Sequence, residues 1–286
     1  MSRALDRPRA RVALAVPNLN QGRYLDAALD SIKQAGSLVV SAVLDADSND
    51  ESRAILERRS DELAFWRSAP DGGQASAVND GLARLSAEFP GVDAVGWLNA
   101  DDFLLSDGLA RMDAALRAHP EWVAVTARGL LADEQGTLGD EIATEPFTRD
   151  RFAQLCTICQ PASLIRRSAW EGVRGLDTSL DMCFDYDLWW RLSHLGPIGY
   201  LDLPAAASRD HGETKTRRRR AIYFEEAKRI VKRETGSVPW HWWISEALER
   251  RVDFEIGRRP GLVGRAAAAL EAGVRYLRDA RDGSGA

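Results

Sequence analysis

The chain has 286 residues, of which 45% are hydrophobic and 28% are charged, a composition typical of folded globular proteins. This composition excludes a mainly disordered, collagen-like or coiled-coil protein, and no apolar run approaches the roughly 18 residues that a membrane-spanning helix needs. The net charge of −5 argues against nucleic acid as a partner. The N-terminal arm lacks the pattern of a signal peptide, so we expect a cytoplasmic protein.

Charge and cysteine usage add two constraints. Residues 211–286 contain 17 Lys and Arg against 11 Asp and Glu, so the acidic excess lies in the first 210 residues. The three cysteines, Cys156, Cys159 and Cys183, are an odd number without a secretion signal, which predicts reduced thiols. Cys156 and Cys159 have CxxC spacing but no second pair, so we favour a structural role over metal or redox chemistry.

Apolar runs that end in polar loops alternate with stretches of helical periodicity over the first hundred residues. This alternation predicts a mostly parallel sheet with helices on its faces. We expect strands at 12–16, 38–44, 65–67 and 94–98, separated by helices at 24–34, 52–59 and 75–85. Beyond residue 102 we expect helices at 107–118, 147–156, 185–195 and 221–235, strands at 122–131 and 161–166, and a helical tail.

Each of the first four strands is followed by a loop rich in Asn, Asp or Gly. Ligands of parallel sheets bind beyond the carboxyl ends of the strands, where such loops meet. We therefore expect the four loops to form one site, and a purely structural role for all of them is the less favoured alternative. The loops comprise residues 17–21, 45–49, 70–74 and 99–102.

Carboxylates in two of these loops indicate the chemistry of the site. Asp101 and Asp102 follow a buried strand and suit a hard divalent cation, although Asp pairs also cap helices. Asp45 and Asp47 end another strand, where an acidic residue can accept hydrogen bonds from a base or a ribose hydroxyl. Helix capping is the alternative, and for Asp47 the two explanations have equal weight.

Eight motifs together resemble the inverting glycosyltransferases of family 2, which have the GT-A fold. They are Val16–Leu25, Leu44–Ser52, Pro70–Ala75, Gly96–Asp102, Gln160–Ser163, Gly175–Asp177, Phe184–Trp189 and His211–Thr216. The resemblance implies an α/β GT-A catalytic domain over residues 12–216, with a Rossmann-like central sheet. An N-terminal arm (1–11) would precede this domain and a helical C-terminal extension (217–286) would follow it.

The resemblance also implies which residues bind a nucleotide-sugar donor, with UDP as the expected nucleotide and Asp45 reading the base. The implied nucleotide-binding residues are Pro17, Asn18, Asn20, Asp45, Asp47, Asp71, Gly73, Gln74, Asn79, Asn99 and Ala100. The implied metal ligands, for Mn²⁺ or Mg²⁺, are Asp101, Asp102 and His211. Asn99 stands where the family has the first Asp of its Asp-x-Asp motif, a departure expected to weaken metal binding.

Inverting transfer needs a group that deprotonates the acceptor hydroxyl, which a positioned carboxylate can do. The resemblance places this base at Asp185, with Asp187 as the second choice, although Phe184 occupies the family's Glu position. The alternative is that both carboxylates cap a helix. The acceptor is expected to be a glycan or a lipid-linked glycoconjugate. Candidate acceptor contacts are Gln160, Trp189 and Trp190, although adjacent tryptophans on a helix are more often core residues.

The C-terminal extension carries a basic and Trp-rich segment. Arg217–Arg220, Lys228, Trp240, Trp242 and Trp243 would suit an anionic leaflet, such as the inner face of a plasma membrane. The favoured alternative is a solvated helix face whose aromatics pack on the catalytic domain or on a homodimer partner.

Two other functions are alternatives to glycosyl transfer. Leu44–Ser48 superficially resembles the nucleophile loop of haloacid-dehalogenase-type phosphatases, but the Thr expected after its Asp-x-Asp is absent. A catalytically degenerate nucleotide-binding protein is the other alternative, because Asn99 and Phe184 both depart from the family's acidic pattern. A dehydrogenase is excluded because no GxGxxG motif is present.

Overall fold

The computed structural model describes residues 10–251 and 262–283, which divide into two compact units. The first unit contains the residues up to Phe147 together with Thr157–Thr214. The second contains Thr148–Cys156 and the residues from Lys215 onward. The short segment 148–156 lies within the range expected for the catalytic domain, but its contacts assign it to the same unit as the C-terminal helices.

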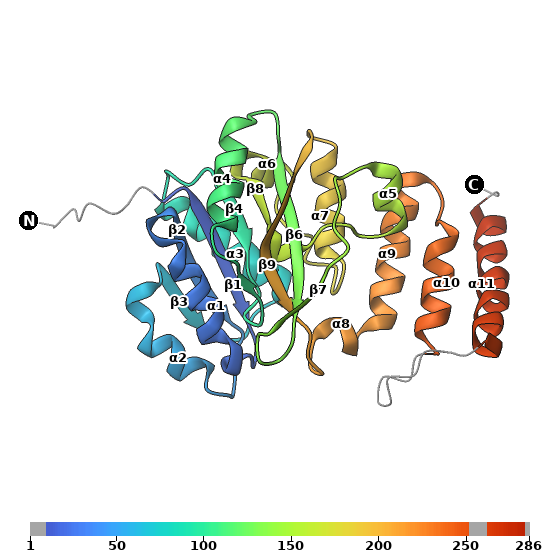
Figure 1. The fold of residues 1–286 in the computed structure, drawn as a ribbon, viewed down its shortest axis with the longest axis horizontal. Coiled ribbons are helices and arrows are strands. Elements are labelled where there is room, and N and C mark those ends of the chain that lie inside the picture. Colours follow the sequence, from blue (N-terminus) through green and yellow to red (C-terminus); the bar gives the residue numbers. More distant parts are fainter. Residues whose placement is uncertain (1–9, 252–261, 284–286) are drawn as a thin grey trace, which may run out of the picture. The chain divides into compact units, whose positions relative to one another are not determined.

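A nine-stranded sheet forms the centre of the first unit (Figure 1). Its order is β3-β2-β1-β4-β8-β6-β9-β5, and β7 pairs with β6 outside this path. The strands are β1 (Val12–Asn18), β2 (Val39–Asp45), β3 (Phe65–Ser68), β4 (Ala94–Trp97), β5 (Phe103–Leu104), β6 (Ala124–Ala132), β7 (Leu138–Glu141), β8 (Ser163–Arg166) and β9 (Ile198–Arg209).

The sheet is parallel across its first four strands and mixed beyond them. β1 pairs in parallel with β2 and with β4, and β2 pairs in parallel with β3. β8 runs antiparallel to both β4 and β6, whereas β9 runs parallel to β6. The predicted α/β architecture is confirmed, and the parallel strands are those for which the sequence showed a regular strand–loop–helix alternation.

The long strand β9 was not predicted. Gly199, Asp202 and Pro204 interrupt its apolar pattern, and Pro cannot donate a ladder hydrogen bond. The structure accommodates Pro204 at a bulge, where the register against β6 shifts at Arg128. The shorter elements β5, β7 and α6 (Arg167–Gly172) were also missed.

Helices pack on both faces of the parallel half. Val12, Leu14 and Val16 point to one face of β1 and share a core with α1 (Gly22–Gln34), α2 (Ser52–Arg58) and α4 (Gly108–Ala118). The alternate residues of β1 face α3 (Gln74–Glu88) on the other side. At Gly81 of α3 an added Cβ would lie only 2.6 Å from Leu44 Cδ2, so glycine permits this close packing. The helix α7 (Phe184–Ser193) also belongs to the first unit and carries the candidate bases Asp185 and Asp187.

The second unit is helical. Its elements are α5 (Arg149–Gln154), α8 (Lys215–Arg218), α9 (Arg220–Thr235), α10 (Trp240–Glu249) and α11 (Leu262–Gly283). Trp242 is buried and donates its Nε1–H to the carbonyl of Ala153 over 2.7 Å. The buried carboxylate of Glu246 binds Lys228 and Arg250, both at 2.6 Å.

This packing argues against the membrane-facing patch, which was the less favoured interpretation of the basic and Trp-rich segment. Trp242 and Trp243 are buried within the second unit, and Lys228 forms an ion pair while its Nζ lies 4.1 Å from the ring centroid of Trp243. These side chains are therefore core residues, and only Trp240 of the three tryptophans is exposed. Within the described ranges, no helix combines the length and the apolar character that crossing a bilayer requires.

The cysteines behave as predicted from their number. No disulfide joins the three, all of which lie in the described part of the chain. Cys159 is buried, and burial together with the nearby charges of Asp102 and Asp185 raises the pKa of its thiol to about 12. Such a thiol stays protonated and is a poor nucleophile or metal ligand, which supports a structural role for Cys159.

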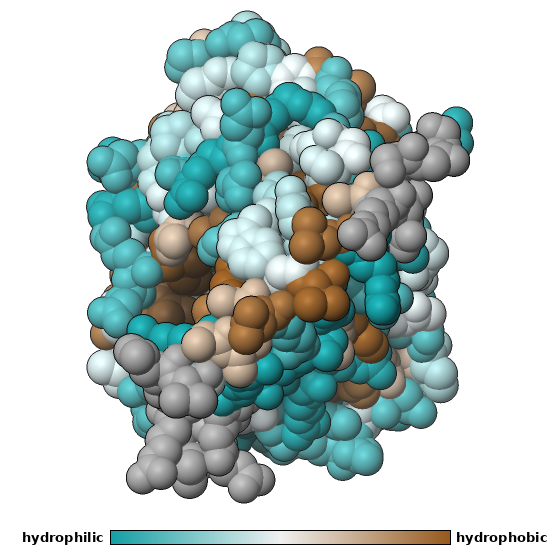
Figure 2. Space-filling model, turned by 90° about the vertical axis from the view of Figure 1, so that its right-hand side faces the viewer, coloured by the Kyte–Doolittle hydropathy of each residue, from teal (hydrophilic) through white to brown (hydrophobic). Residues whose placement is uncertain are grey.

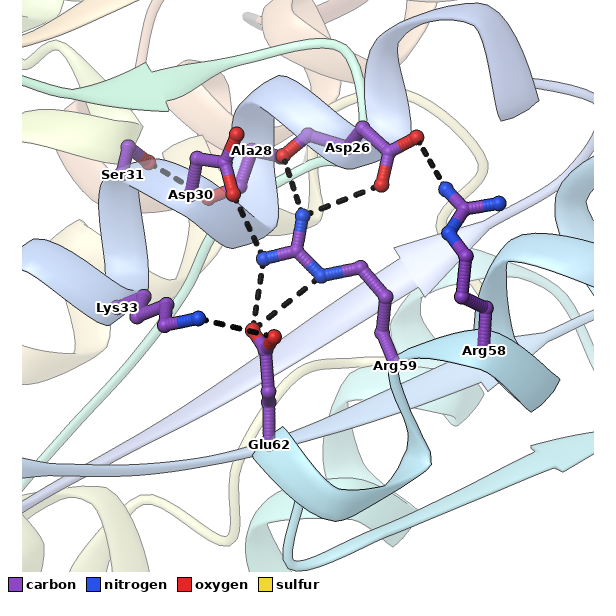
Figure 3. A network of polar contacts seen from close by, with 8 residues as sticks. All are labelled: Asp26, Ala28, Asp30, Ser31, Lys33, Arg58, Arg59 and Glu62. Atoms are coloured by element: carbon purple, nitrogen blue, oxygen red, sulfur yellow. Dashed lines mark hydrogen bonds and ion pairs between the residues drawn. The ribbon is translucent and has the colours of Figure 1, made fainter.

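A charged network fixes α1 against the end of α2 (Figure 3). The largely buried guanidinium of Arg59 contacts Asp26 at 3.1 Å, Asp30 at 2.7 Å and Glu62 at 2.7 Å. Arg58 adds a 2.6 Å ion pair to Asp26. Because α1 follows the loop after β1 and α2 follows the loop after β2, this network holds together the two helices that these loops lead into.

Replacing Arg59 should therefore weaken the first unit. We expect Arg59→Ala to lower the free energy of unfolding by about 2 kcal/mol, because it leaves the carboxylates of Asp26, Asp30 and Glu62 without their common cation. Chemical denaturation measures this change. The matched control is Arg53→Ala on the same helix, whose exposed pair with Glu57 should contribute less than about 0.5 kcal/mol. Equal effects of the two variants would contradict a special role for Arg59.

Candidate active site

The ends of the parallel strands bring the predicted loops together. In the sheet register, Asn18 at the end of β1 lies opposite Asp45 at the end of β2, and Asp45 lies opposite Ser68 at the end of β3. Leu98, just beyond β4, donates its N–H to the carbonyl of Ala15 on β1. The expected convergence of the four loops at one edge of the sheet is thus confirmed.

Asp45 joins three of these loops. Its carboxylate is fully buried and accepts hydrogen bonds from Asn18 Nδ2 at 2.6 Å, Ser48 Oγ at 2.5 Å and Ser68 Oγ at 2.5 Å. The backbone N–H of Ser48 adds a fourth bond at 3.1 Å. A buried carboxylate with four donors cannot act as an exposed nucleophile, which excludes the phosphatase alternative. A nucleotide base could reach Asp45 only by displacing one of these donors.

Asn20 and Asp47 lie on the solvent side of the loops that Asp45 connects. Both are exposed, and both have a positive φ, 54° for Asn20 and 63° for Asp47. Asn and Asp tolerate this left-handed conformation better than most residues do. The backbone N–H of Asn20 binds Ser48 Oγ at 2.8 Å, and its side-chain oxygen accepts from the N–H of Asn49 at 2.9 Å. The two loops therefore present a rigid polar edge to solvent. Pro17, which precedes them, is buried.

A chain of side-chain amides connects α3 to the acidic loop. Gln74 Nε2 donates to Asn99 Oδ1 at 2.8 Å, and Asn99 Nδ2 donates to Asp102 Oδ2 at 3.0 Å. An aspartate at position 99 could not donate this second bond and would add a charge beside Asp101 and Asp102. The departure at Asn99 is thus built into the hydrogen bonding of the loop. Ala100 is buried between these residues.

The loop after β3 ends in a tight turn at the start of α3. Asp71 Oδ1 accepts the backbone N–H of Gly73 at 2.8 Å, and Gly73 has a φ of 94°, a conformation that favours glycine. Gly73 is exposed. The turn therefore leaves the beginning of α3 open beside Gln74 and Asn99.

Asn79 has a different role from the predicted one. Its amide donates to the carbonyl of Leu176 and accepts the N–H of the same residue, both at 2.9 Å. Gly175 has a φ of 69°, and a Cβ there would lie 2.5 Å from Asn79 Oδ1. Asn79 is thus committed to holding the 175–176 turn, which corrects its assignment to nucleotide binding.

The acidic loop pairs with His211. His211 is buried, and its Nε2 lies 3.1 Å from Asp101 Oδ2. Its Nδ1 lies 3.3 Å from the backbone nitrogen of Glu213, whose N–H it accepts. The ring of Tyr24 lies 4.8 Å from the imidazole. Sequence reasoning therefore selected two residues, 110 positions apart, that are in contact.

Asp102 has partners other than His211. It is buried and accepts the backbone N–H of Arg209 at 3.0 Å in addition to the bond from Asn99. Burial, and then the neighbouring charge of Asp101, raises the pKa of Asp102 to about 7. Each oxygen of Asp102 thus accepts a hydrogen bond within the protein, whereas Asp101 remains partly exposed, so the structure favours Asp101 over Asp102 as a metal ligand.

Sequence reasoning missed Arg209, which lies at the end of the unpredicted strand β9. Its guanidinium binds the carbonyls of Asp101 at 2.9 Å and of Asp133 and Glu134 at 3.0 Å. It also lies over the rings of Tyr24 and Phe103. Arg209 therefore fixes the backbone of the acidic loop, and the signal that was overlooked is the apolar run of three alanines just before it.

Asp101 and His211 suit a divalent cation as one edge of its shell. Neighbouring ligands of an octahedral Mg²⁺ at about 2.1 Å lie roughly 3 Å apart, which matches the 3.1 Å between their side-chain atoms. In the described ranges, no group of three or more Asp, Glu, His or Cys side chains could hold a metal ion. A cation at this pair would therefore take its remaining ligands from water and substrate oxygens.

The two candidate bases differ in their surroundings. Asp185 opens α7, is partly buried, and accepts the N–H of Tyr186 at 2.7 Å. Asp187 is buried and forms a 2.6 Å ion pair with Arg191, which in turn binds the carbonyls of Val173 and Gly175. The structure therefore favours Asp185 over Asp187 as the base, since Asp187 holds α7 to the 173–175 turn.

Aromatic packing brings Asp185 toward the acidic loop. The rings of Phe184, next to Asp185, and Trp97, two residues before Asn99, have centroids 6.5 Å apart. The charges of Asp102 and Asp185 also both act on Cys159. The loop after β4 and the first turn of α7 thus border the same region of the first unit.

The predicted acceptor contacts are corrected. Trp189 and Trp190 are fully buried, so neither can stack on an acceptor sugar, and the core alternative is right. Gln160 is also buried and donates to the carbonyl of Trp97 at 2.7 Å. It supports the end of β4 from beneath the site. The described structure therefore leaves the acceptor surface without an assigned residue.

Comparisons with known proteins agree with this geometry. The sequence pattern of the family described as "Glycosyl transferase family 2" matches residues 13–173. The chain is 23% identical over 224 residues to chondroitin synthase from Escherichia coli, covering 77% of this chain but only 32% of that protein. This chain thus spans about one third of that relative's length.

Solved structures share the fold. S. aureus TarS 1–349 in complex with UDP-GlcNAc is similar with a TM-score of 0.63 and 15% identity, over 94% of this chain and 81% of that chain. Mannosyltransferase PcManGT from Pyrobaculum calidifontis, in complex with GDP-Man and Mn²⁺, is similar with a TM-score of 0.59 and 17% identity, over 94% and 87%. At these identities the likeness concerns the fold, and it agrees with the predicted GT-A architecture.

The Asp187–Arg191 pair gives a test of the site's construction. We expect Asp187→Asn to lower the free energy of unfolding by about 2 to 3 kcal/mol, because it leaves the guanidinium of Arg191 half-buried without its anion. The matched control Asp107→Asn, whose pair with Arg111 is exposed, should leave it almost unchanged. Thermal and urea denaturation of both variants measure the difference. A stable Asp187→Asn protein would contradict the structural assignment of Asp187.

Proposed function

Because this chain belongs to glycosyl transferase family 2, we propose that it transfers a sugar from a nucleoside-diphosphate donor to a hydroxyl group of a glycan or glycoconjugate acceptor, with inversion at the anomeric carbon. The observation that carries the proposal is the contact between Asp101 and His211 at the carboxyl edge of the sheet, in the region that Asp185 also borders. UDP is the proposed nucleotide, as the resemblance implies.

In this proposal the loops divide the work. Asn20, Asp47 and the turn at Asp71 and Gly73 form the polar edge on which the nucleotide rests, while the buried Asn18 and Asp45 hold the loops in place. Asp101 and His211 would hold Mn²⁺ or Mg²⁺, which supplies positive charge to the departing diphosphate. Arg209, Asn99 and Asp102 keep Asp101 in place through the contacts described above.

Asp185 is the proposed base. Its partly exposed carboxylate can accept the proton of the acceptor hydroxyl as that oxygen attacks the anomeric carbon and the bond to the diphosphate breaks. In direct displacement the base and the diphosphate-binding pair must both border the anomeric carbon, and the packing of Phe184 against Trp97 supports such proximity of α7 and the loop after β4. The burial of Asp187 supports this choice.

The first test is donor binding. We expect UDP with Mn²⁺ to stabilise the protein more than GDP, CDP, TDP or ADP in a thermal-shift panel, by about 2.7 kcal/mol at 100 times the dissociation constant. His211→Ala should remove the part of the shift that depends on Mn²⁺ and keep the metal-free part. If none of the nucleotides shifts the transition, the donor site is not where we place it.

The second test is catalysis. We expect Asp185→Asn to lower kcat for sugar transfer or donor hydrolysis by about 100- to 10,000-fold, because the acceptor loses its general base. The same variant should keep the nucleotide-dependent thermal shift of the unmodified protein. Near-normal turnover in Asp185→Asn would disprove the assignment. Nucleotide binding without any turnover in the unmodified protein would instead indicate the catalytically degenerate alternative.

A further inference from the structure

The helix α11 is amphipathic with its polarity reversed. Three of its charged side chains form ion pairs within the second unit: Glu271 pairs with Arg251 at 2.8 Å, Arg275 with Glu246 at 3.0 Å, and Asp279 with Lys232 at 2.7 Å. The small side chains of Ala268 and Ala272 are fully buried between these pairs. A helix of a globular protein ordinarily packs its apolar face and exposes its charges.

The opposite face of α11 is apolar and exposed. Leu270, Val274 and Leu277 are 75%, 64% and 59% exposed, and their spacing of four and three residues aligns them along one side of the helix. We refer to these three residues as the α11 stripe. Figure 2 shows brown, apolar side chains gathered on the face of the molecule that includes α11, surrounded by polar ones. Such rimmed apolar patches mark interaction surfaces.

Two aromatic residues stand at the edge of the stripe. Trp240 of α10 is 42% exposed and Tyr276 is 38% exposed, and their rings meet edge to face with centroids 5.7 Å apart. A Cβ at Gly273 would lie 3.9 Å from Trp240 Cη2, which places this indole one helical turn from both Leu270 and Leu277. Trp and Tyr beside an apolar surface are typical of the boundary between membrane and water.

The charges around the stripe favour an anionic occupant. The two acidic side chains of α11 named above are both bound on its inward face, whereas Arg278 is exposed. Residues 211–286 as a whole carry 17 Lys and Arg against 11 Asp and Glu. A second copy of this chain would bring two basic segments together, while an anionic lipid surface would complement them.

We propose that the α11 stripe binds this protein peripherally to a membrane that contains anionic lipids. Leu270, Val274 and Leu277 enter the boundary between headgroups and acyl chains, Trp240 and Tyr276 lie at headgroup level, and Arg278 faces lipid phosphates. This surface differs from the basic segment expected from the sequence, whose tryptophans 242 and 243 are buried. The proposal is independent of the proposed transferase activity.

Vesicle flotation of the full-length protein tests this proposal. The unmodified protein should float with vesicles of phosphatidylglycerol and phosphatidylcholine at low salt and float less at high salt, because ions screen the arginine contacts. A variant with Leu270→Gln, Val274→Gln and Leu277→Gln should lose at least about tenfold of this binding. Since all three side chains are exposed, the variant should keep the circular dichroism spectrum and the nucleotide-dependent thermal shift.

The matched control carries three exposed leucines of the first unit changed in the same way, Leu131→Gln, Leu138→Gln and Leu195→Gln. This control should float like the unmodified protein. Failure of the unmodified protein to float, or equal flotation of the stripe variant, would overturn the proposal. Light scattering that shows a dimer in the unmodified protein and a monomer in the stripe variant, without flotation of either, would assign the stripe to a second copy instead.

Discussion

A buried carboxylate at the end of β2 is the contact on which the candidate site depends. Three loops leave the sheet at neighbouring strand ends, and each sends a hydroxyl or amide donor to Asp45. Hydrogen bonds to an ionised group are stronger than those between neutral groups, and a buried carboxylate that lost them would be costly. The position of each loop is therefore coupled to the others, and the polar edge above Asp45 is rigid before any ligand arrives.

Hydrogen bonds from neighbouring donors also explain the conformation of the acidic loop at residues 99–102. Asn99 donates to Asp102, Arg209 donates to Asp102 through its backbone and to the carbonyl of Asp101 through its side chain, and Asp101 is left to meet His211. A third carboxylate, at position 99, would need a cation to offset its repulsion from Asp101 and Asp102, whereas the amide of Asn99 stabilises the loop on its own. The departure at Asn99 is thus compatible with a working site, because the partly exposed carboxylate of the loop is still present.

The second unit has several ion pairs in its interior. Glu246 is buried among Lys228, Arg250 and Arg275, and these ion pairs draw the charged residues of α9, α10 and α11 inward. Burial lowers the pKa of Lys228 despite its pairing with Glu246, so this lysine is held in an environment that disfavours its charge. With the charges occupied inside the bundle, apolar side chains remain for the outer face of α11.

The sequence by itself determined the parallel half of the fold and the place of the site. Strand and helix periods are local properties, so the alternation over the first hundred residues predicted β1 to β4 and the helices between them, and the polar residues at the strand ends predicted where the loops would meet. The motif of His211 could be matched to Asp101 across 110 positions because both belong to a recurrent family pattern.

Tertiary structure decided what the periodicity of the sequence cannot encode. Partners distant in the chain decide whether a polar or aromatic side chain faces a ligand or the interior. Such partners hold Asn79 and Asp102 and bury the paired tryptophans, Asp45 and Asp187. The strand β9 and its Arg209 escaped prediction for the same reason, since a bulge and long-range pairing with β6, rather than a local pattern, make Pro204 acceptable in a strand.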